Sequence, residues 1–159
     1  MQKYKVYFWK YMPRNMFKEI KQRYKNRLND YMNVYVCEEY KEMYDLVDKI
    51  EKEKQERDYG AKTWCIDKNY YEIETNLYVK TSSCCGYMYF NKKQFFMDTI
   101  SHESTHAVIG YFNRKLKDYR TVFADIDKTG EEINGNIQNE ELFCYMVGNI
   151  GNQIVIKTD

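Results

Sequence analysis

The hydrophobic pattern of this chain changes between the period of a helix and that of a strand. Apolar residues recur at spacings of three and four in residues 14–29, 38–58 and 93–113, as expected of amphipathic helices. The apolar stripe of the first of these helices consists of Phe17, Ile20, Tyr24 and Leu28. A fourth helix is expected to begin at Glu140, with Asn139 as its cap, and to end near residue 150.

Short runs of β-branched and aromatic residues separate these helices and predict strands. The predicted strands are residues 4–9, 32–37, 62–67, 70–80 and 87–90, and residues 153–156 also have strand character. Residues 114–137 are polar and irregular, with a hairpin expected around residues 127–130. A chain of 159 residues with this mixture of elements predicts a single α+β unit.

Charge divides the chain into a basic N-terminal element, residues 1–30, and a main domain, residues 31–159. The whole chain has a net charge of +1, but residues 1–30 carry nine Lys or Arg against Glu19 and Asp30. Such a segment can dock nucleic acid or an acidic partner, or it can be a solvated helix face. We expect the two parts to form one compact unit.

Cysteine usage and hydropathy argue against a disulfide-rich, secreted or membrane-spanning protein. The five cysteines include one adjacent pair and no C-x-x-C spacing, which argues against a disulfide framework and against a cysteine zinc site. No run approaches the 18 or so apolar residues that span a bilayer. Lys3, Lys5 and Lys10 interrupt the apolar segment that a secretion signal would need. The sequence therefore predicts a soluble, non-secreted protein without a membrane partner.

The two histidines of the chain, His102 and His106, are four residues apart inside a predicted helix. This spacing places both imidazoles on one helix face, one turn apart, where they can bind the same zinc ion. Glu103 projects beside that site, where it can hold a zinc-bound water and accept its proton. The H-E-x-x-H arrangement thus predicts a Zn²⁺ site with two histidine ligands and Glu103 as general base.

A catalytic zinc usually has three protein ligands, and no histidine remains for the third position. The candidate carboxylates after His106 are Asp125 and Asp127, Glu131 and Glu132, and Glu140 and Glu141. Glu140 and Glu141 begin an otherwise apolar helix, in which a charge without a partner would be costly to bury. They are therefore the favoured candidates, and ordinary first-turn acids stabilised by the helix dipole are the alternative.

The segment from His102 to His106, with the predicted strand Tyr87–Phe90 before it and the run from Asn139 to Gly148 after it, resembles the zincin metallopeptidases. It is most similar to small H-E-x-x-H proteins encoded by bacteriophages and prophages, in which a second helix opens with Asn-(Asp/Glu)-Glu. The resemblance implies a zincin-like fold: a small mixed sheet packed on the motif helix and on a second, ligand-bearing helix. It also implies that Glu141 is the third zinc ligand, with Glu140 as the neighbouring alternative.

The same resemblance implies zinc-dependent hydrolysis of peptide bonds, in which metal-activated water attacks the carbonyl and Glu103 relays the proton. A peptide or protein substrate would add a strand to the edge formed by residues 86–91. The donor that stabilises the oxyanion would be Tyr111, Tyr119 or Tyr145.

The alternative is a non-catalytic phage structural or host-interaction protein that retains the zincin-like fold. Glu103 favours the enzyme, because a purely structural zinc site has no use for a base. The enzyme is expected in the cytoplasm of a bacterial host, and a structural protein in the virion.

Overall fold

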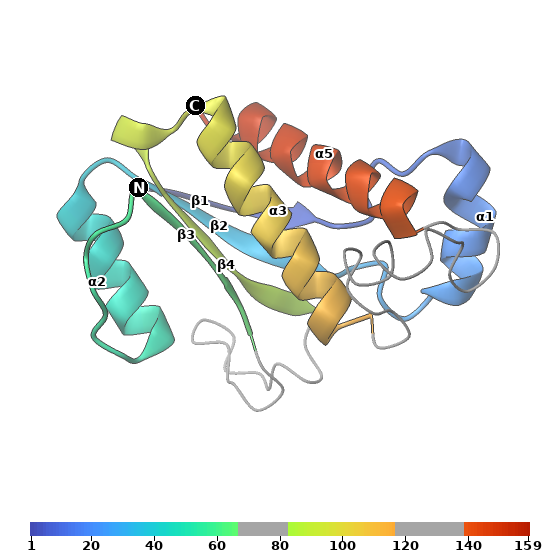
Figure 1. Ribbon diagram of the computed structural model, residues 1–159, viewed down its shortest axis with the longest axis horizontal. Helices are drawn as coiled ribbons and strands as arrows, with labels where there is room; N and C mark the ends of the chain where they lie inside the picture. Colours follow the sequence, from blue (N-terminus) through green and yellow to red (C-terminus); the bar gives the residue numbers. More distant parts are fainter. Residues whose placement is uncertain (67–82, 117–138) are drawn as a thin grey trace.

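The computed structural model describes residues 1–66, 83–116 and 139–159. Its strands form one four-stranded mixed sheet in the order β1-β2-β4-β3 (Figure 1). The strands are β1 Gln2–Tyr7, β2 Tyr31–Cys37, β3 Ala61–Cys65 and β4 Cys84–Asn91. β2 and β4 pair in parallel, whereas β1 pairs antiparallel with β2, and β3 antiparallel with β4. The α+β class predicted from the sequence is confirmed in this part of the chain.

Helices cover both faces of the sheet. They are α1 Arg14–Arg23, α2 Tyr40–Glu51, α3 Met97–Arg114 and α5 Asn139–Lys157, with a 3-10 turn, η1, at Lys92–Gln94. α3 and α5 lie side by side on one face, α2 packs on the other, and α1 lies at the end of the molecule away from α2 (Figure 1). Every residue of the central strands β2 and β4 is buried, as expected where a sheet is covered on both sides.

Alternate residues of β2 contribute to two different cores, because successive side chains of a strand point to opposite faces. Met32, Val34 and Val36 enter the core beneath α3 and α5, whereas Tyr31, Tyr35 and Cys37 enter the core beneath α2. The sheet therefore fixes the position of α3 relative to the rest of the molecule.

Helix α5 is longer than the sequence pattern predicts. The predicted strand at residues 153–156 is wrong, because α5 continues to Lys157. Side chains with no exposed surface recur every fourth residue along this helix, at Leu142, Met146, Ile150 and Ile154. This spacing keeps the helix packed on the core through its last turns, and this packing outweighs the strand propensity of its β-branched residues.

Helix α2 is shorter than predicted. The sequence pattern predicts a helix over residues 38–58, but the helix ends at Glu51, and Lys52 follows in the left-handed conformation with φ 57°. Residues 52–58 contain no apolar side chain, so a longer helix would bury nothing further.

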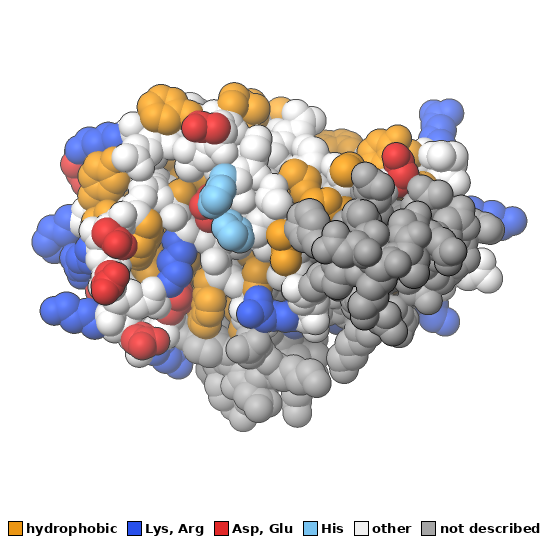
Figure 2. All heavy atoms as spheres, viewed as in Figure 1, with side chains coloured by type: hydrophobic (Ala, Val, Ile, Leu, Met, Phe, Trp, Pro, Cys, Tyr) orange, Lys and Arg blue, Asp and Glu red, His pale blue; other side chains and the backbone are white. Residues whose placement is uncertain are grey.

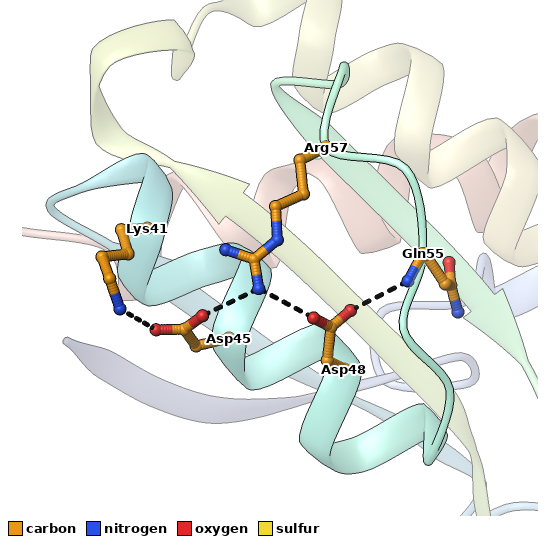
Figure 3. A network of polar contacts seen from close by, with 5 residues as sticks. All are labelled: Lys41, Asp45, Asp48, Gln55 and Arg57. Atoms are coloured by element: carbon orange, nitrogen blue, oxygen red, sulfur yellow. Dashed lines mark hydrogen bonds and ion pairs between the residues drawn. The ribbon is translucent and has the colours of Figure 1, made fainter.

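The segment after α2 folds back along the helix through ion pairs (Figure 3). The Arg57 guanidinium donates to Asp45 at 2.9 Å and to Asp48 at 2.8 Å. Lys41 donates to the other oxygen of Asp45 at 2.6 Å, and the backbone N–H of Gln55 donates to Asp48 at 3.2 Å. These contacts hold the segment between α2 and β3 against the helix.

The basic N-terminal element belongs to the same sheet, and α5 holds it in place. The Gln153 side-chain amide accepts a hydrogen bond from the N–H of Tyr7 and donates one to its carbonyl, both at 2.8 Å. Asn149 donates to the carbonyl of Phe8 at 2.9 Å. Residues 1–30 are therefore bonded directly to the C-terminal helix of the main domain.

Two of the predicted elements, the strand at residues 70–80 and the hairpin around residues 127–130, lie outside the described residues. Among the helices that are described, none is both long enough and apolar enough to cross a membrane.

Candidate metal centre

Helix α3 carries the H-E-x-x-H motif and runs beside strand β3. Its core-facing side is formed by the buried side chains of Ile100, Ala107, Val108 and Tyr111. Gly110 allows the helix to approach β3 closely, because a Cβ at this position would lie 2.1 Å from the Sγ of Cys65. The motif therefore lies on a helix whose position is set by tight packing.

The side chains of His102 and His106 lie on the exposed side of α3 and converge. Their Nε2 atoms are 3.1 Å apart, and their ring centroids are 4.7 Å apart with an interplanar angle of 80°. Figure 2 shows the two imidazoles as one patch on the open surface of the molecule. Both rings are thus accessible to an ion from solvent.

This geometry suits two ligands of one zinc ion. Two Zn–N bonds of about 2.0–2.1 Å at a tetrahedral angle would place the nitrogen atoms about 3.3 Å apart. The observed separation of 3.1 Å between the Nε2 atoms is close to that value, and it is also that of a hydrogen bond between the two rings. The donor pair therefore fits zinc, which would accept both imidazole nitrogens on one side.

Glu103 is buried between α3 and β3, with 6% of its surface exposed. The Thr63 hydroxyl donates to the Glu103 Oε1 atom at 2.8 Å and lies 3.2 Å from the Glu103 backbone carbonyl oxygen. The second carboxylate oxygen, Oε2, is 3.9 Å from the Nε2 of His102. One oxygen is thus held by the sheet, and the other lies beside the histidine pair.

Thr63 is a site residue that the sequence pattern does not reveal. It lies in the predicted strand 62–67, but its partner Glu103 is 40 residues further along the chain. Only the three-dimensional pairing of β3 with β4 brings the strand beneath α3. The alternation of β3 could have indicated which residues share its helix-facing side, but not which helix they meet.

The structure does not bring Glu141 to the histidine pair. Glu141 is exposed in the first turn of α5. Gly151 of α5 lies against the motif, since a Cβ at this position would lie 3.6 Å from the Oγ of Ser104. Gly151 follows Glu141 by ten residues, or about 15 Å of helix rise. Glu141 therefore stays a predicted ligand that this structure does not place at the site.

The described residues contain no group of three or more His, Cys, Asp or Glu side chains arranged to hold a metal ion. The other predicted candidates for the third ligand, Asp125, Asp127, Glu131, Glu132 and the side chain of Glu140, lie outside the described residues. The site as described consists of two imidazoles and one adjacent carboxylate.

Of the three tyrosines considered as oxyanion donors, Tyr111 already uses its hydroxyl in two buried hydrogen bonds. Its buried hydroxyl donates to Asp30 at 2.7 Å and accepts from the Trp9 indole at 2.8 Å. Burial and the nearby Asp30 carboxylate raise the pKa of Tyr111 well above its ordinary value. Tyr145 is 43% exposed on α5, and Tyr119 lies outside the described residues.

The expectation that residues 86–91 offer a free strand edge to a peptide is wrong. These residues lie in β4, which is hydrogen-bonded to β2 on one side and to β3 on the other. Within the part of the sheet that is described, β3 forms the edge next to α3. The parallel pairing of β4 with β2, far apart in sequence, causes this difference.

Comparisons of the chain with protein families, with curated proteins and with solved structures gave no match.

Proposed function

We propose that this protein is a zinc-dependent hydrolase that cleaves peptide bonds, with Glu103 as its general base. The supporting observation is the convergence of two imidazole nitrogens, 3.1 Å apart, beside a buried carboxylate. Burying a carboxylate is costly unless it is paired or hydrogen-bonded, and here the Thr63 hydroxyl provides one hydrogen bond. The same residue types at this spacing are those that the resemblance to zincins assigns to the zinc ligands and the base.

His102 and His106 would hold the ion through their Nε2 atoms. A bound zinc ion supplies Lewis-acid polarisation of a carbonyl and lowers the pKa of water. Glu103 accepts the proton of the attacking water on Oε2, because Thr63 already occupies Oε1 at 2.8 Å. The carboxylic acid then gives that proton to the amine that leaves the broken peptide bond.

A second candidate function is zinc binding without catalysis, in a structural or host-interaction protein. It is favoured by one observation, since the described residues supply only two zinc ligands and the base. A catalytic zinc usually has three protein ligands. Turnover distinguishes the two candidates, because both require the histidine pair and only the enzyme requires the base.

The experiment combines metal analysis with a peptide-cleavage assay on purified protein. We expect one zinc per chain in the native protein and its loss from His102→Ala and His106→Ala. Glu103→Gln, which keeps the shape of the side chain, should retain zinc and lose about 10²- to 10⁴-fold in cleavage rate. The exposed Glu56→Gln variant is the matched control and should behave as the native protein does.

Separate Glu140→Ala and Glu141→Ala variants test the third ligand, because zinc should be lost from only one of them. If the native protein binds zinc and cleaves nothing in a broad peptide library, the non-catalytic function is supported. If it binds no zinc, the hydrolase and any zinc-dependent role are excluded, and only a structural or host-interaction protein without metal is left.

A further inference from the structure

Helix α1 presents basic side chains along its solvent face, and the candidate metal centre does not use them. Arg14, Lys18, Lys21 and Lys25, the last just beyond the helix end, are exposed and recur at spacings of four, three and four. This spacing places them on one side of the helix. Figures 1 and 2 show α1 at the end of the molecule away from α2, with basic side chains projecting from that end.

No acidic side chain in the described part of the chain forms an ion pair with these four cations. The one acid of α1, Glu19, lies on the flank of the helix and pairs with Arg23 at 3.3 Å. Among the described residues, the charge of the solvent face is therefore not neutralised by an ion pair, and it can attract an external anion. By contrast, Arg57 near α2 is compensated by Asp45 and Asp48.

The apolar side of α1, opposite the basic face, is not available for insertion into a membrane. Met16 and Ile20, with Tyr24 just after the helix, are buried in the core shared with α3 and α5. An amphipathic helix that lies in a membrane interface inserts its apolar face between the headgroups. Because Met16, Ile20 and Tyr24 are already packed, α1 cannot insert this face into a membrane, and we take a soluble polyanion as the partner of its basic side.

One aromatic side chain borders the basic face. Phe17 is 46% exposed, and the Lys21 Nζ lies 4.2 Å from the centroid of its ring. Proteins that bind single-stranded nucleic acid combine basic residues that track phosphates with exposed aromatic rings on which bases stack.

We propose that the solvent face of α1 binds single-stranded nucleic acid without sequence preference. Arg14, Lys18, Lys21 and Lys25 contact the phosphates, and Phe17 stacks on a base. The proposal is independent of the zinc site, because none of these residues contacts the histidine pair.

The test measures fluorescence anisotropy of a labelled oligothymidine of about 20 nucleotides, between about 50 and 200 mM salt. We expect a dissociation constant of order 10⁻⁵ M, typical of non-specific binding. Lys18→Ala/Lys25→Ala should weaken binding and reduce the slope of log K against log salt by about 1.4, since each lost phosphate contact contributes about 0.7. Phe17→Ala should weaken binding at least about fivefold.

The matched control is Lys49→Ala/Lys54→Ala, which removes the same charge from exposed positions on and after α2. It should leave the salt slope at the native value. All the replaced lysines are exposed, and thermal unfolding checks that each variant is folded.

Four results would overturn the proposal. One is the absence of binding at millimolar protein, and another is equal loss in the α1 and control variants. A third is unchanged affinity in Phe17→Ala, with a duplex bound as tightly as the single strand. The fourth is equally effective competition by polyglutamate, which would identify an acidic polypeptide as the partner.

Discussion

Tyr111 joins α3 to the loop before β2 through a chain of buried hydrogen bonds. The Trp9 indole donates to the Tyr111 hydroxyl, which donates to Asp30, and Arg27 donates to the same Asp30 oxygen at 2.6 Å. Burial raises the pKa of the Asp30 carboxyl, while Tyr111 and Arg27 act in the opposite direction. The Trp9 indole, the Tyr111 hydroxyl and the Asp30 carboxylate therefore depend on one another for the hydrogen bonds that water would otherwise provide.

Replacing Tyr111 by Phe should destabilise the protein by about 1–3 kcal/mol, because the indole N–H and the carboxylate each lose a buried partner. Urea unfolding measures the change. The control is Tyr145→Phe, since Tyr145 is 43% exposed and should tolerate the change. Equal stability of the two variants would show that the buried hydroxyl contributes nothing net.

Thr63 gives a second prediction at the scale of single residues. Thr63→Val removes the hydrogen bond to the Glu103 Oε1 atom and frees the carboxylate to turn. We expect a loss of about 1 kcal/mol in stability and a fall of about tenfold or more in peptide cleavage, with the zinc content unchanged. Thr63→Ser keeps the hydroxyl and should restore both quantities. A valine variant with native stability and cleavage would contradict the positioning role.

The candidate site shows which of its residues a sequence can reveal. His102, Glu103 and His106 are recognisable because a single helix sets their geometry through local spacing. Thr63 is not, because its contact depends on where β3 lies in the sheet. The place of Glu140 and Glu141 at the start of an apolar helix favours both as ligands, and only the resemblance to zincins selects Glu141. The register of α5 against α3 determines what Glu141 can reach.

At the scale of elements, the segment after α2 is held by the ion pairs of Arg57 with Asp45 and Asp48 (Figure 3). The hydrogen bond from Lys41, followed by that from Arg57, lowers the pKa of Asp45 below its ordinary 3.8. The hydrogen bond from Arg57 likewise lowers the pKa of Asp48. The network therefore depends on ionised carboxylates.

A carboxylate with a lowered pKa in the folded state stabilises the protein above its unfolded pKa, and this contribution is lost on acidification. Arg57→Gln should therefore unfold at a lower temperature than the native protein near pH 6. The difference should shrink as the pH falls below about 4, and it should also shrink at high salt. Lys54→Gln, at an exposed position on the same segment, is the control. A difference that stays constant from pH 6 to the acid limit would contradict the role of these ion pairs.

The boundaries of α2 and α5 show where local patterns stop being informative. The charges of residues 52–58 are compatible with a helix, but Arg57 bonds back to the preceding turns instead. The β-branched residues 154–156 suggest a strand, whereas Gln153 is fixed by Tyr7, 146 residues away in sequence. The sequence therefore predicts helices and strands where one face of a local segment packs on the core. It does not predict them where contacts with residues far away in the sequence determine the structure.

At the scale of the whole molecule, the histidine pair lies on an element that connects several parts of the structure. α3 packs on the sheet and on α5, and α5 in turn holds β1 through Asn149 and Gln153. A ligand that binds only the folded arrangement of α3 should therefore stabilise the entire described fold. Local fraying of α3 alone would separate the imidazoles and also expose the core beneath them.

Zinc should accordingly raise the free energy of global unfolding, by about 2.7 kcal/mol at a free concentration of one hundred times its dissociation constant. Denaturant unfolding with and without zinc measures this change, and fluorescence and circular dichroism should report the same midpoint. Glu103→Gln should respond as the native protein does, because Glu103 is not a ligand in the proposed site. His102→Ala/His106→Ala should show no response. A stabilisation that persisted in this double variant would place the ion elsewhere, for example on the exposed Cys144, and would separate metal binding from the motif on α3.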